Sequence, residues 1–304
     1  MFGYKEKPGE IPYASNAADF LRQLASGEDS KDFKLSSVLN NINERFADQT
    51  RLIVDGMFKS CVENWKGMPD YTLVTPDRYA QMTNHKGNYP SMYIPRSFLS
   101  SGKGALLFSH YVPNAISARM PSAIELYTIN FLSLFHEYVH MAQDAVIPLT
   151  AEFVAKNLLL VEGLPPVLSM LFEKEVAKKI GIEGYTYQNN RELYSIVEQY
   201  ASNDAKAREF LDYVNNELGE VELKIRGRQF HDINSVGYAR DAYNGHFNGI
   251  RRMGFVDNYY AVGAVLFYII YKKELPFKRF LNTAIGMHTQ RELLERAIGE
   301  VGTL

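Results

Sequence analysis

Two histidines separated by three residues mark the segment with the clearest chemical signal, His136-Glu137-Tyr138-Val139-His140. Residues four apart lie on the same face of a helix, so both imidazoles can reach one ion. Glu137 points elsewhere but can reach a water that the ion activates, which places it as a general base. Imidazole and carboxylate donors suit Zn²⁺, and a catalytic zinc takes three protein ligands with one position left for water. We therefore expect one zinc ion bound by His136 and His140.

The third ligand of such a site comes from further along the chain. One large class of these sites takes a histidine six residues after the second one, but that position holds Val146, and position 143 is Gln143. That class is excluded. A carboxylate from a following helix is the other common source, and Glu152 and Glu162 are both candidates. Burying two imidazoles and a carboxylate on an apolar helix without a metal would be costly, which disfavours a purely structural role.

Glu162 lies in the segment Leu160-Val161-Glu162-Gly163-Leu164, which is 162 − 140 = 22 positions after His140. This segment resembles the Glu-Gly segment of gluzincins, the HExxH metallopeptidases whose third zinc ligand is a downstream glutamate. The resemblance implies Glu162 as the third ligand and a zincin-like catalytic domain. Pro165-Pro166 departs from the family, because a proline at 165 clashes with the carbonyl of Val161 inside a helix. We therefore expect Glu162 to end one helix or to precede the first turn of the next.

A second segment, Tyr260-Ala261-Val262-Gly263-Ala264, resembles the Tyr-x-x-Gly-Ala helix start of the aminopeptidase-N branch of the gluzincins. In that branch the tyrosine hydroxyl hydrogen-bonds the oxyanion of the intermediate, and the glycine permits close helix packing. The resemblance implies this role for Tyr260, while Tyr259 and His246 stay open as alternatives. The Gly-x-Met-Glu-Asn segment with which that branch grips a free amine is not in this sequence. Endopeptidase and exopeptidase action are therefore both open.

Three other polar positions could serve the same site. Asp144, one turn beyond His140, can orient that imidazole or can be a solvated acid at a helix end. His110 follows a strand-like run, so it can line the cleft or lie at the surface. The pair Arg251-Arg252 can bind a substrate carboxylate or remain exposed loop charges.

The remainder of the chain predicts an α+β protein that is predominantly helical. Apolar residues recur at helical spacing in many segments, and Ser15 is the expected cap of the first helix. The expected helices span residues 15–26, 35–65, 124–146 with Pro121 in the first turn, about 150–163, 166–180, 189–202, 204–218, 256–273 and 290–299. Three short apolar or β-branched runs predict a small antiparallel sheet: 71–75, 92–94 and 105–108.

A stretch rich in glycine and tyrosine, residues 181–190, predicts a boundary between two parts of the chain. Residues 1–182 would hold the N-terminal helices, the small sheet and the HExxH helix, forming a catalytic half. Residues 183–304 would form a helical C-terminal half that completes the cleft. One continuous domain is the alternative.

Composition narrows the class of protein. The 304 residues are 46% hydrophobic and 22% charged, which is typical of globular proteins. The net charge of −2 and the lack of a basic-aromatic motif argue against nucleic-acid binding. The apolar stretch 259–271 is interrupted by Gly263 and is too short for a membrane span. Residues 1–8 lack the apolar run of a secretory signal, and the single cysteine, Cys61, cannot form an intramolecular disulfide. We expect a cytoplasmic or other intracellular protein without membrane insertion.

These features together predict a zinc metallopeptidase that acts on a peptide or protein substrate. Zinc held by His136, His140 and Glu162 would lower the pKa of its water, and Glu137 would take the proton as that water attacks. Zinc and Tyr260 would stabilise the oxyanion. The alternative is a non-catalytic helical binding or scaffold protein that retains a zinc site.

Overall fold

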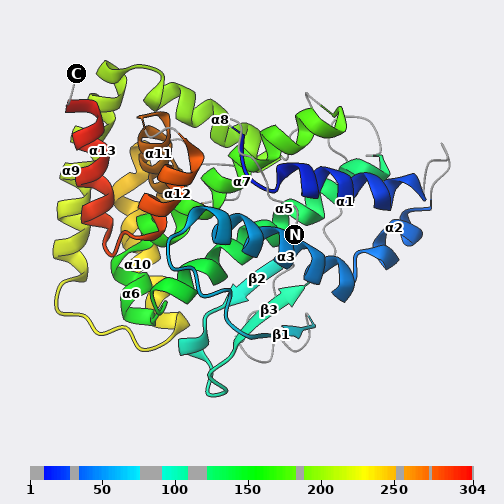
Figure 1. The fold of residues 1–304 in the computed structure, drawn as a ribbon. Coiled ribbons are helices and arrows are strands. Elements are labelled where there is room, and N and C mark those ends of the chain that lie inside the picture. Colours follow the sequence, from blue (N-terminus) through cyan, green and yellow to red (C-terminus); the bar gives the residue numbers. More distant parts are fainter. Residues whose placement is uncertain are drawn as a thin grey trace.

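The computed structural model describes residues 10–27, 34–75, 91–108, 122–182, 188–250, 257–273 and 276–302. Over these ranges the protein is predominantly helical, with a three-stranded sheet at one side of the helical body (Figure 1). The expected α+β class is confirmed at this level. No helix within these ranges has the length and apolar character needed to cross a membrane. Pro121, His110 and Arg251-Arg252 lie outside the described residues.

The helices were mostly predicted, but some of their bounds differ. They are α1 (Ala14–Ser26), α2 (Leu35–Asn41), α3 (Glu44–Cys61), α5 (Ala123–Val146), α6 (Ala151–Lys156), α7 (Leu158–Ile180), α8 (Gln188–Ala201), α9 (Asp204–Ile225), α10 (Ile233–His246), α11 (Asn258–Lys273), α12 (Phe277–Ile285) and α13 (Gln290–Gly302), with single 3₁₀ turns η1 (Arg96–Phe98) and η2 (Phe247–Gly249). Helices α10 and α12 were missed. Helix α10 reads Ile-Asn-Ser-Val-Gly-Tyr-Ala-Arg-Asp-Ala-Tyr-Asn-Gly-His, in which apolar residues are too sparse to give a clear helical period.

Two helix starts differ from the expected ones. The helix predicted over 35–65 is divided into α2 and α3, because the Asn43 side chain accepts hydrogen bonds from the backbone N–H groups of Arg45 and Phe46 and so starts a new helix. Ser15 is not a cap, since it lies inside α1, whose N-cap residue is Tyr13. The Tyr13 ring fills the space beside Gly56, so a tertiary contact decides where the chain enters α1.

The sheet is mixed, which corrects the antiparallel prediction. Its order is β1 (Tyr71–Val74), β3 (Gly104–Phe108), β2 (Ser91–Ile94). Strand β2 pairs with β3 antiparallel, whereas β1 pairs with β3 parallel. The short link between β2 and β3 permits only the antiparallel arrangement, but the chain between β1 and β3 is long enough for a parallel crossover.

Helix α5 carries the two histidines and begins with a capping box. The Ser122 backbone N–H and hydroxyl both donate to Glu125 Oε2, at 2.6 and 2.9 Å. Tyr138, between the two histidines, is fully buried, and its hydroxyl donates to the Ala47 carbonyl of α3 at 2.9 Å. Its oxygen also lies 3.1 Å from the Tyr71 hydroxyl of β1. Helix α5 is therefore tied to both a neighbouring helix and the sheet.

Helix α7 runs through both prolines, so the break expected beside Glu162 is wrong. Pro165 and Pro166 lie inside the helix and are buried. An interior proline costs about 3 kcal/mol because a backbone hydrogen bond is lost and the ring crowds the preceding turn. Helix α7 is apolar on all sides and buried along most of its length, so tertiary packing outweighs that local cost.

The break in this part of the chain comes earlier, at Asn157 between α6 and α7. The Asn157 side chain is buried, donates to the Phe153 carbonyl at 3.0 Å and accepts from the Gln290 backbone N–H at 3.0 Å. This single side chain ends α6 and connects it to the start of α13. A single asparagine in a mostly apolar stretch gives a weaker sequence signal than a proline pair, which is why the predicted break was misplaced.

The most extensive helix contact in the described core is the crossing of α7 and α11. A Cβ atom added to Gly163 would lie 2.5 Å from the carbonyl carbon of Gly263, and one added to Gly263 would lie 2.3 Å from the Leu159 carbonyl oxygen. The two backbones touch, so this crossing tolerates no side chain at either glycine. One hydrophobic cluster extends from Ile11 to Val301 and includes residues on both sides of the predicted boundary. The two-part division itself stays a prediction.

Candidate metal centre

His136 and His140 lie one turn apart on α5 and face the same space. Their ring centres are 5.1 Å apart, with the ring planes at 70°. Two imidazoles bound through nitrogen to one tetrahedral zinc have ring centres about 5 Å apart at ordinary bond lengths. Burial lowers the pKa of His136 to about 3, with a further decrease from the neighbouring His140. His136 is therefore neutral at physiological pH, as a metal ligand must be.

Glu162 of α7 points its carboxylate at His140. Glu162 Oε2 lies 3.4 Å from His140 Nε2, and two atoms bound to one tetrahedral zinc lie about 3.3 Å apart. This oxygen is fully buried and is left without a hydrogen bond of ordinary geometry among the described residues, while the Tyr260 hydroxyl also lies within reach of the Glu162 carboxylate. Burial alone would raise the pKa of Glu162, but contact with His140 and the charge of Arg240 outweigh it and lower the pKa to about 2. A buried and ionised carboxylate fits a cation.

A contact at Nδ1, the nitrogen that faces away from Glu162, orients the His140 imidazole. Its Nδ1 lies 3.2 Å from Gln143 Oε1, and Gln143 Nε2 donates to the Leu160 carbonyl of α7 at 3.2 Å. This contact leaves Nε2 free to face Glu162. Burial would lower the pKa of His140, but Glu162 reverses the effect and raises it. Without a metal, Glu162 therefore favours the protonated form of His140.

Two pairs of these side chains, His136 with His140 and His140 with Glu162, have spacings that suit a zinc ion, but the three side chains do not form a closed site. In the part of the chain that the structure describes, no three His, Cys, Asp or Glu side chains converge closely enough to form a complete metal-binding cluster. The donor set of two imidazoles and one carboxylate suits zinc, and the His140–Glu162 spacing already matches it. Binding of the ion at three ligands would require a side-chain adjustment.

Glu137 lies beside the histidines and is held by the sheet. Its Oε2 accepts the backbone N–H of Tyr93 in β2 at 2.7 Å. Burial raises the pKa of Glu137 to about 7, although His140 and the Tyr93 N–H act in the opposite direction. A carboxylate with a pKa near neutrality can both take and return a proton at physiological pH.

Tyr260 at the start of α11 is the tyrosine that reaches this space. Its ring stacks on His136 with ring centres 6.2 Å apart, and it lines the same cavity as Glu137 and Glu162. Burial raises the pKa of Tyr260 well above its usual value, and Glu162 adds to the shift, so the phenol stays a neutral hydrogen-bond donor. Tyr259 instead donates its hydroxyl to Asp257 Oδ2 at 2.8 Å.

Two other sequence candidates lie elsewhere. His246 Nδ1 lies 3.2 Å from Glu217 Oε2 of α9, and His246 does not line the cavity that the described residues form. Glu152 on α6 pairs with Lys156 and accepts the Phe230 backbone N–H at 3.0 Å. The geometry therefore places His140 beside both His136 and Glu162, and leaves Glu152 and His246 elsewhere.

A cavity of about 310 Å³ opens in front of Glu137, His140, Glu162 and Tyr260, and its described lining does not include His136. Strand β2 and the turn after it form one wall, α5 and α7 form the floor, and α10 forms the opposite wall. The lining is largely apolar with a few polar groups, as in most small-molecule or peptide sites. Its residues are Met92, Tyr93, Ile94, Pro95, Phe98, Glu137, His140, Leu149, Val154, Val161, Glu162, Asn234, Val236, Gly237, Arg240 and Tyr260.

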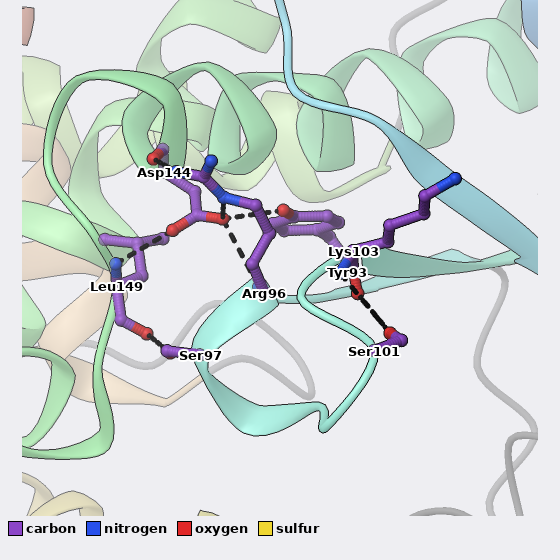
Figure 2. Close-up of polar contacts among 7 residues, drawn as sticks. All are labelled: Tyr93, Arg96, Ser97, Ser101, Lys103, Asp144 and Leu149. Atoms are coloured by element: carbon purple, nitrogen blue, oxygen red, sulfur yellow. Dashed lines mark hydrogen bonds and ion pairs between the residues drawn. The ribbon is translucent and has the colours of Figure 1, made fainter.

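Asp144 fastens the β2 wall to the end of α5, and neither role considered from the sequence applies (Figure 2). It is 1% exposed, so it is not a solvated acid, and its partners do not include His140 among the described contacts. Its Oδ2 accepts the Tyr93 hydroxyl at 2.8 Å and Arg96 Nε at 3.0 Å, while its Oδ1 accepts the Leu149 N–H at 2.9 Å. Arg96 Nη2 also donates to the Asp144 carbonyl at 2.6 Å. We call Tyr93, Arg96 and Asp144 the carboxylate latch.

Sequence reasoning missed three residues of this site. Gln143 could have been found, because it lies one turn after His140 on the same face of α5. Tyr93 acts partly through its backbone N–H, for which the side chain gives no signal. Arg240 lies on α10, a helix that the hydrophobic pattern did not reveal, and its Nη2 is 3.5 Å from Glu162 Oε1.

Comparison with protein-family models, with curated proteins and with solved structures finds no match to this chain. Function therefore has to be argued from the site itself.

Proposed function

We propose that this chain is a zinc-dependent peptidase in which His136, His140 and Glu162 bind one zinc ion and Glu137 is the general base. The observation that carries the proposal is the buried pair of His140 Nε2 and Glu162 Oε2, 3.4 Å apart. The sequence resemblance to gluzincins supports the same ligand set. When bound, a zinc ion supplies Lewis-acid activation of water and of the scissile carbonyl.

Glu137 would handle the proton in this reaction. Its carboxylate lines the cavity, and the Tyr93 N–H fixes one of its oxygens while the other stays available. With a pKa of about 7, the carboxylate takes a proton from the attacking water and returns it to the leaving amine. Hydrolysis thus breaks the amide C–N bond, with the water oxygen going to the acyl part and its protons to the amine.

Tyr260 would stabilise the negative charge that develops on the scissile carbonyl oxygen. Its phenol lines the cavity beside His136, and burial keeps it protonated and able to donate. A preorganised donor to a developing oxyanion lowers the activation barrier by about 2.7–4 kcal/mol. Replacing Tyr260 by Phe should therefore lower kcat about 10²-fold or more with little change in zinc content.

The test of the proposal is the Glu137→Gln variant assayed against a mixed peptide library. The amide keeps the size of the side chain and can still accept the Tyr93 N–H, so we expect normal zinc content and a loss of at least about 10²-fold in cleavage rate. Glu152→Gln, on the surface of α6, is the matched control and should cleave normally. Full activity in Glu137→Gln would overturn the proposal. Stoichiometric zinc with no cleavage by the wild type would instead favour the non-catalytic binding or scaffold alternative.

A further inference from the structure

One wall of the cavity is a face of α10 that the proposed chemistry does not use. Asn234, Gly237 and Arg240 are spaced three apart and line the cavity together with Val236. Beside Gly237 the space is open, since an added Cβ would meet no described atom within 4 Å. Arg240 is the single Lys or Arg side chain among the described residues that form the lining. This wall of the cavity therefore places the Arg240 guanidinium, a fixed positive charge, next to the open space beside Gly237.

The guanidinium of Arg240 is poorly satisfied within the protein. Its one hydrogen bond to the described residues is a long contact, Nη2 to Glu162 Oε1 at 3.5 Å. Its Nε is buried and donates to no described atom. A guanidinium has five donors in a planar fork that matches a carboxylate, and 42% of this side chain remains exposed. Buried donors without partners indicate a missing acceptor.

The charge of the site also favours an anion. Glu137 and Glu162 are the two acidic side chains of the described lining. This step rests on the proposed function, because a divalent zinc ion would balance the two carboxylates. Within the lining Arg240 then adds one positive charge that a substrate carboxylate would neutralise, while Asp257, which also acts on Arg240, lies outside the lining and accepts the Tyr259 hydroxyl.

The position of Arg240 limits which carboxylate can reach it. The guanidinium contacts Oε1 of Glu162, whose other oxygen, Oε2, faces His140. Among the described residues, only the Glu162 carboxylate separates Arg240 from the metal centre, a gap comparable to the ~3.3–3.6 Å that one residue of extended chain spans. The cavity beside it is lined by apolar side chains, including Val154, Val236 and Phe98.

We propose that Arg240 binds the free C-terminal carboxylate of a peptide whose last residue is apolar, so that the enzyme cleaves the last peptide bond. Hydrolysis by water then releases the last residue as a free amino acid and leaves a new carboxylate on the shortened peptide. Arg240 is thus a determinant of substrate class, and the activity is that of a carboxypeptidase.

The test compares a dipeptide that has a free carboxylate with the same dipeptide as an amide. N-acetyl-Phe-Leu and N-acetyl-Phe-Leu-amide are titrated by calorimetry into the zinc-loaded Glu137→Gln protein, which cannot consume them. A bidentate ion pair predicts that the free acid binds at least about tenfold more tightly. Adding Arg240→Gln to this variant should reduce the ratio of acid affinity to amide affinity to near one. Adding Arg240→Lys should give an intermediate ratio, because lysine keeps the charge but cannot form a bidentate pair with the carboxylate.

Arg228→Gln is the matched control. Arg228 stacks on the Tyr238 ring at 3.6 Å and is not part of the described cavity lining, so its loss should leave the ratio unchanged. Equal binding of the acid and the amide by Glu137→Gln would overturn the proposal. A preference for the acid that remains after Arg240 is replaced would overturn it too. If Arg240 merely positions Glu162, both ligands should weaken equally and zinc content should fall, which also overturns it.

Failure of the proposed function gives a different result. If the wild type cleaves neither peptide but the preference for the acid over the amide depends on Arg240, the carboxylate-binding site is supported and the peptidase activity is refuted. If the wild type cleaves acid and amide at equal rates, the peptidase stands and the carboxylate site does not.

Discussion

The two sides of the candidate metal centre are positioned by opposite physical means. On one side, α7 and α11 touch through the backbones of Gly163 and Gly263, and Glu162 and Tyr260 lie next to this crossing. On the other side, the carboxylate latch of Tyr93, Arg96 and Asp144 ties β2 to α5 and so holds the N–H that binds Glu137. The first side is positioned by close backbone packing, which requires that Gly163 and Gly263 have no side chain. The second side is positioned by hydrogen bonds to the charged Asp144 carboxylate.

This difference predicts two kinds of sensitivity. Close backbone packing is disrupted by a single added methyl group, because neither backbone can move without shifting its whole helix. A buried polar cluster tolerates small changes of shape but not the loss of its central charge. The first side carries one proposed zinc ligand, Glu162, whereas the second holds the N–H that binds the proposed base, Glu137. The other two proposed ligands lie on α5, which its own packing also holds. Damage to the two sides should therefore affect zinc binding and catalysis separately.

The largest expected effect is that of Gly263→Ala. Its methyl group would lie 2.3 Å from the Leu159 carbonyl oxygen, so α7 and α11 must separate. We expect the free energy of unfolding to fall by about 3 kcal/mol or more, with weaker zinc binding because Glu162 moves with α7. Urea denaturation and zinc titration measure the two effects. Gly299→Ala in α13 is the control, because an added Cβ there meets no described atom within 4 Å and should stabilise by about 0.5–1 kcal/mol.

The next effect in size is that of Asp144→Ala. It removes the acceptor for Tyr93, Arg96 and the Leu149 N–H, and we expect a loss of about 2–3 kcal/mol in stability. Zinc affinity should stay close to that of the wild type while cleavage falls, because Glu137 loses its positioned partner. Asp19→Ala is the control, since Asp19 pairs with Arg22 at the exposed surface and should contribute little. A parallel loss of zinc would contradict the separation of the two sides.

A smaller effect, dependent on pH, is expected for Glu137→Gln without metal. Because the folded-state pKa of Glu137 is raised to about 7 by burial, the wild type is most stable below the unfolded pKa and loses stability as pH rises through 7. The glutamine variant lacks this loss. It should therefore match the wild type near pH 4.5 and exceed it by on the order of 1–2 kcal/mol at pH 8. Thermal unfolding of the metal-free proteins at both pH values measures this, and a constant difference would refute it.

The smallest effect concerns the hydroxyl of Tyr93. Tyr93→Phe removes its hydrogen bond to Asp144 but keeps the backbone N–H that binds Glu137. We expect a loss of about 1 kcal/mol in stability, because Asp144 retains Arg96 and the Leu149 N–H. Cleavage should be nearly unchanged, which unfolding and activity assays on one preparation would show.

The sequence predicted those parts of the site that are encoded locally. The spacing of His136 and His140 places both on one helix face, and the apolar run around them predicted a buried helix, which α5 is. The three short strands were found from their β-branched and apolar residues. Their pairing was not, because the order β1-β3-β2 depends on a crossover that no single segment specifies.

Features that depend on tertiary contact were missed. Pro165 and Pro166 predicted a break that core packing overrides, and Asn157 makes the break instead. Asp144 is fixed by partners from a distant strand, and Arg240 enters the cavity from a helix with little hydrophobic periodicity. The roles of these residues depend on contacts with residues that are distant in the sequence, and the local sequence gives no signal of such contacts.

Zinc content is the measurement that tests the central claim most directly. The purified full-length protein, incubated with zinc and desalted, should hold about one zinc ion per chain by elemental analysis. His140→Ala and Glu162→Ala should lose most of it, whereas Glu137→Gln and Glu152→Ala should keep it. A wild type that retains no zinc would contradict the account, as would a Glu162→Ala variant that binds zinc as tightly as the wild type.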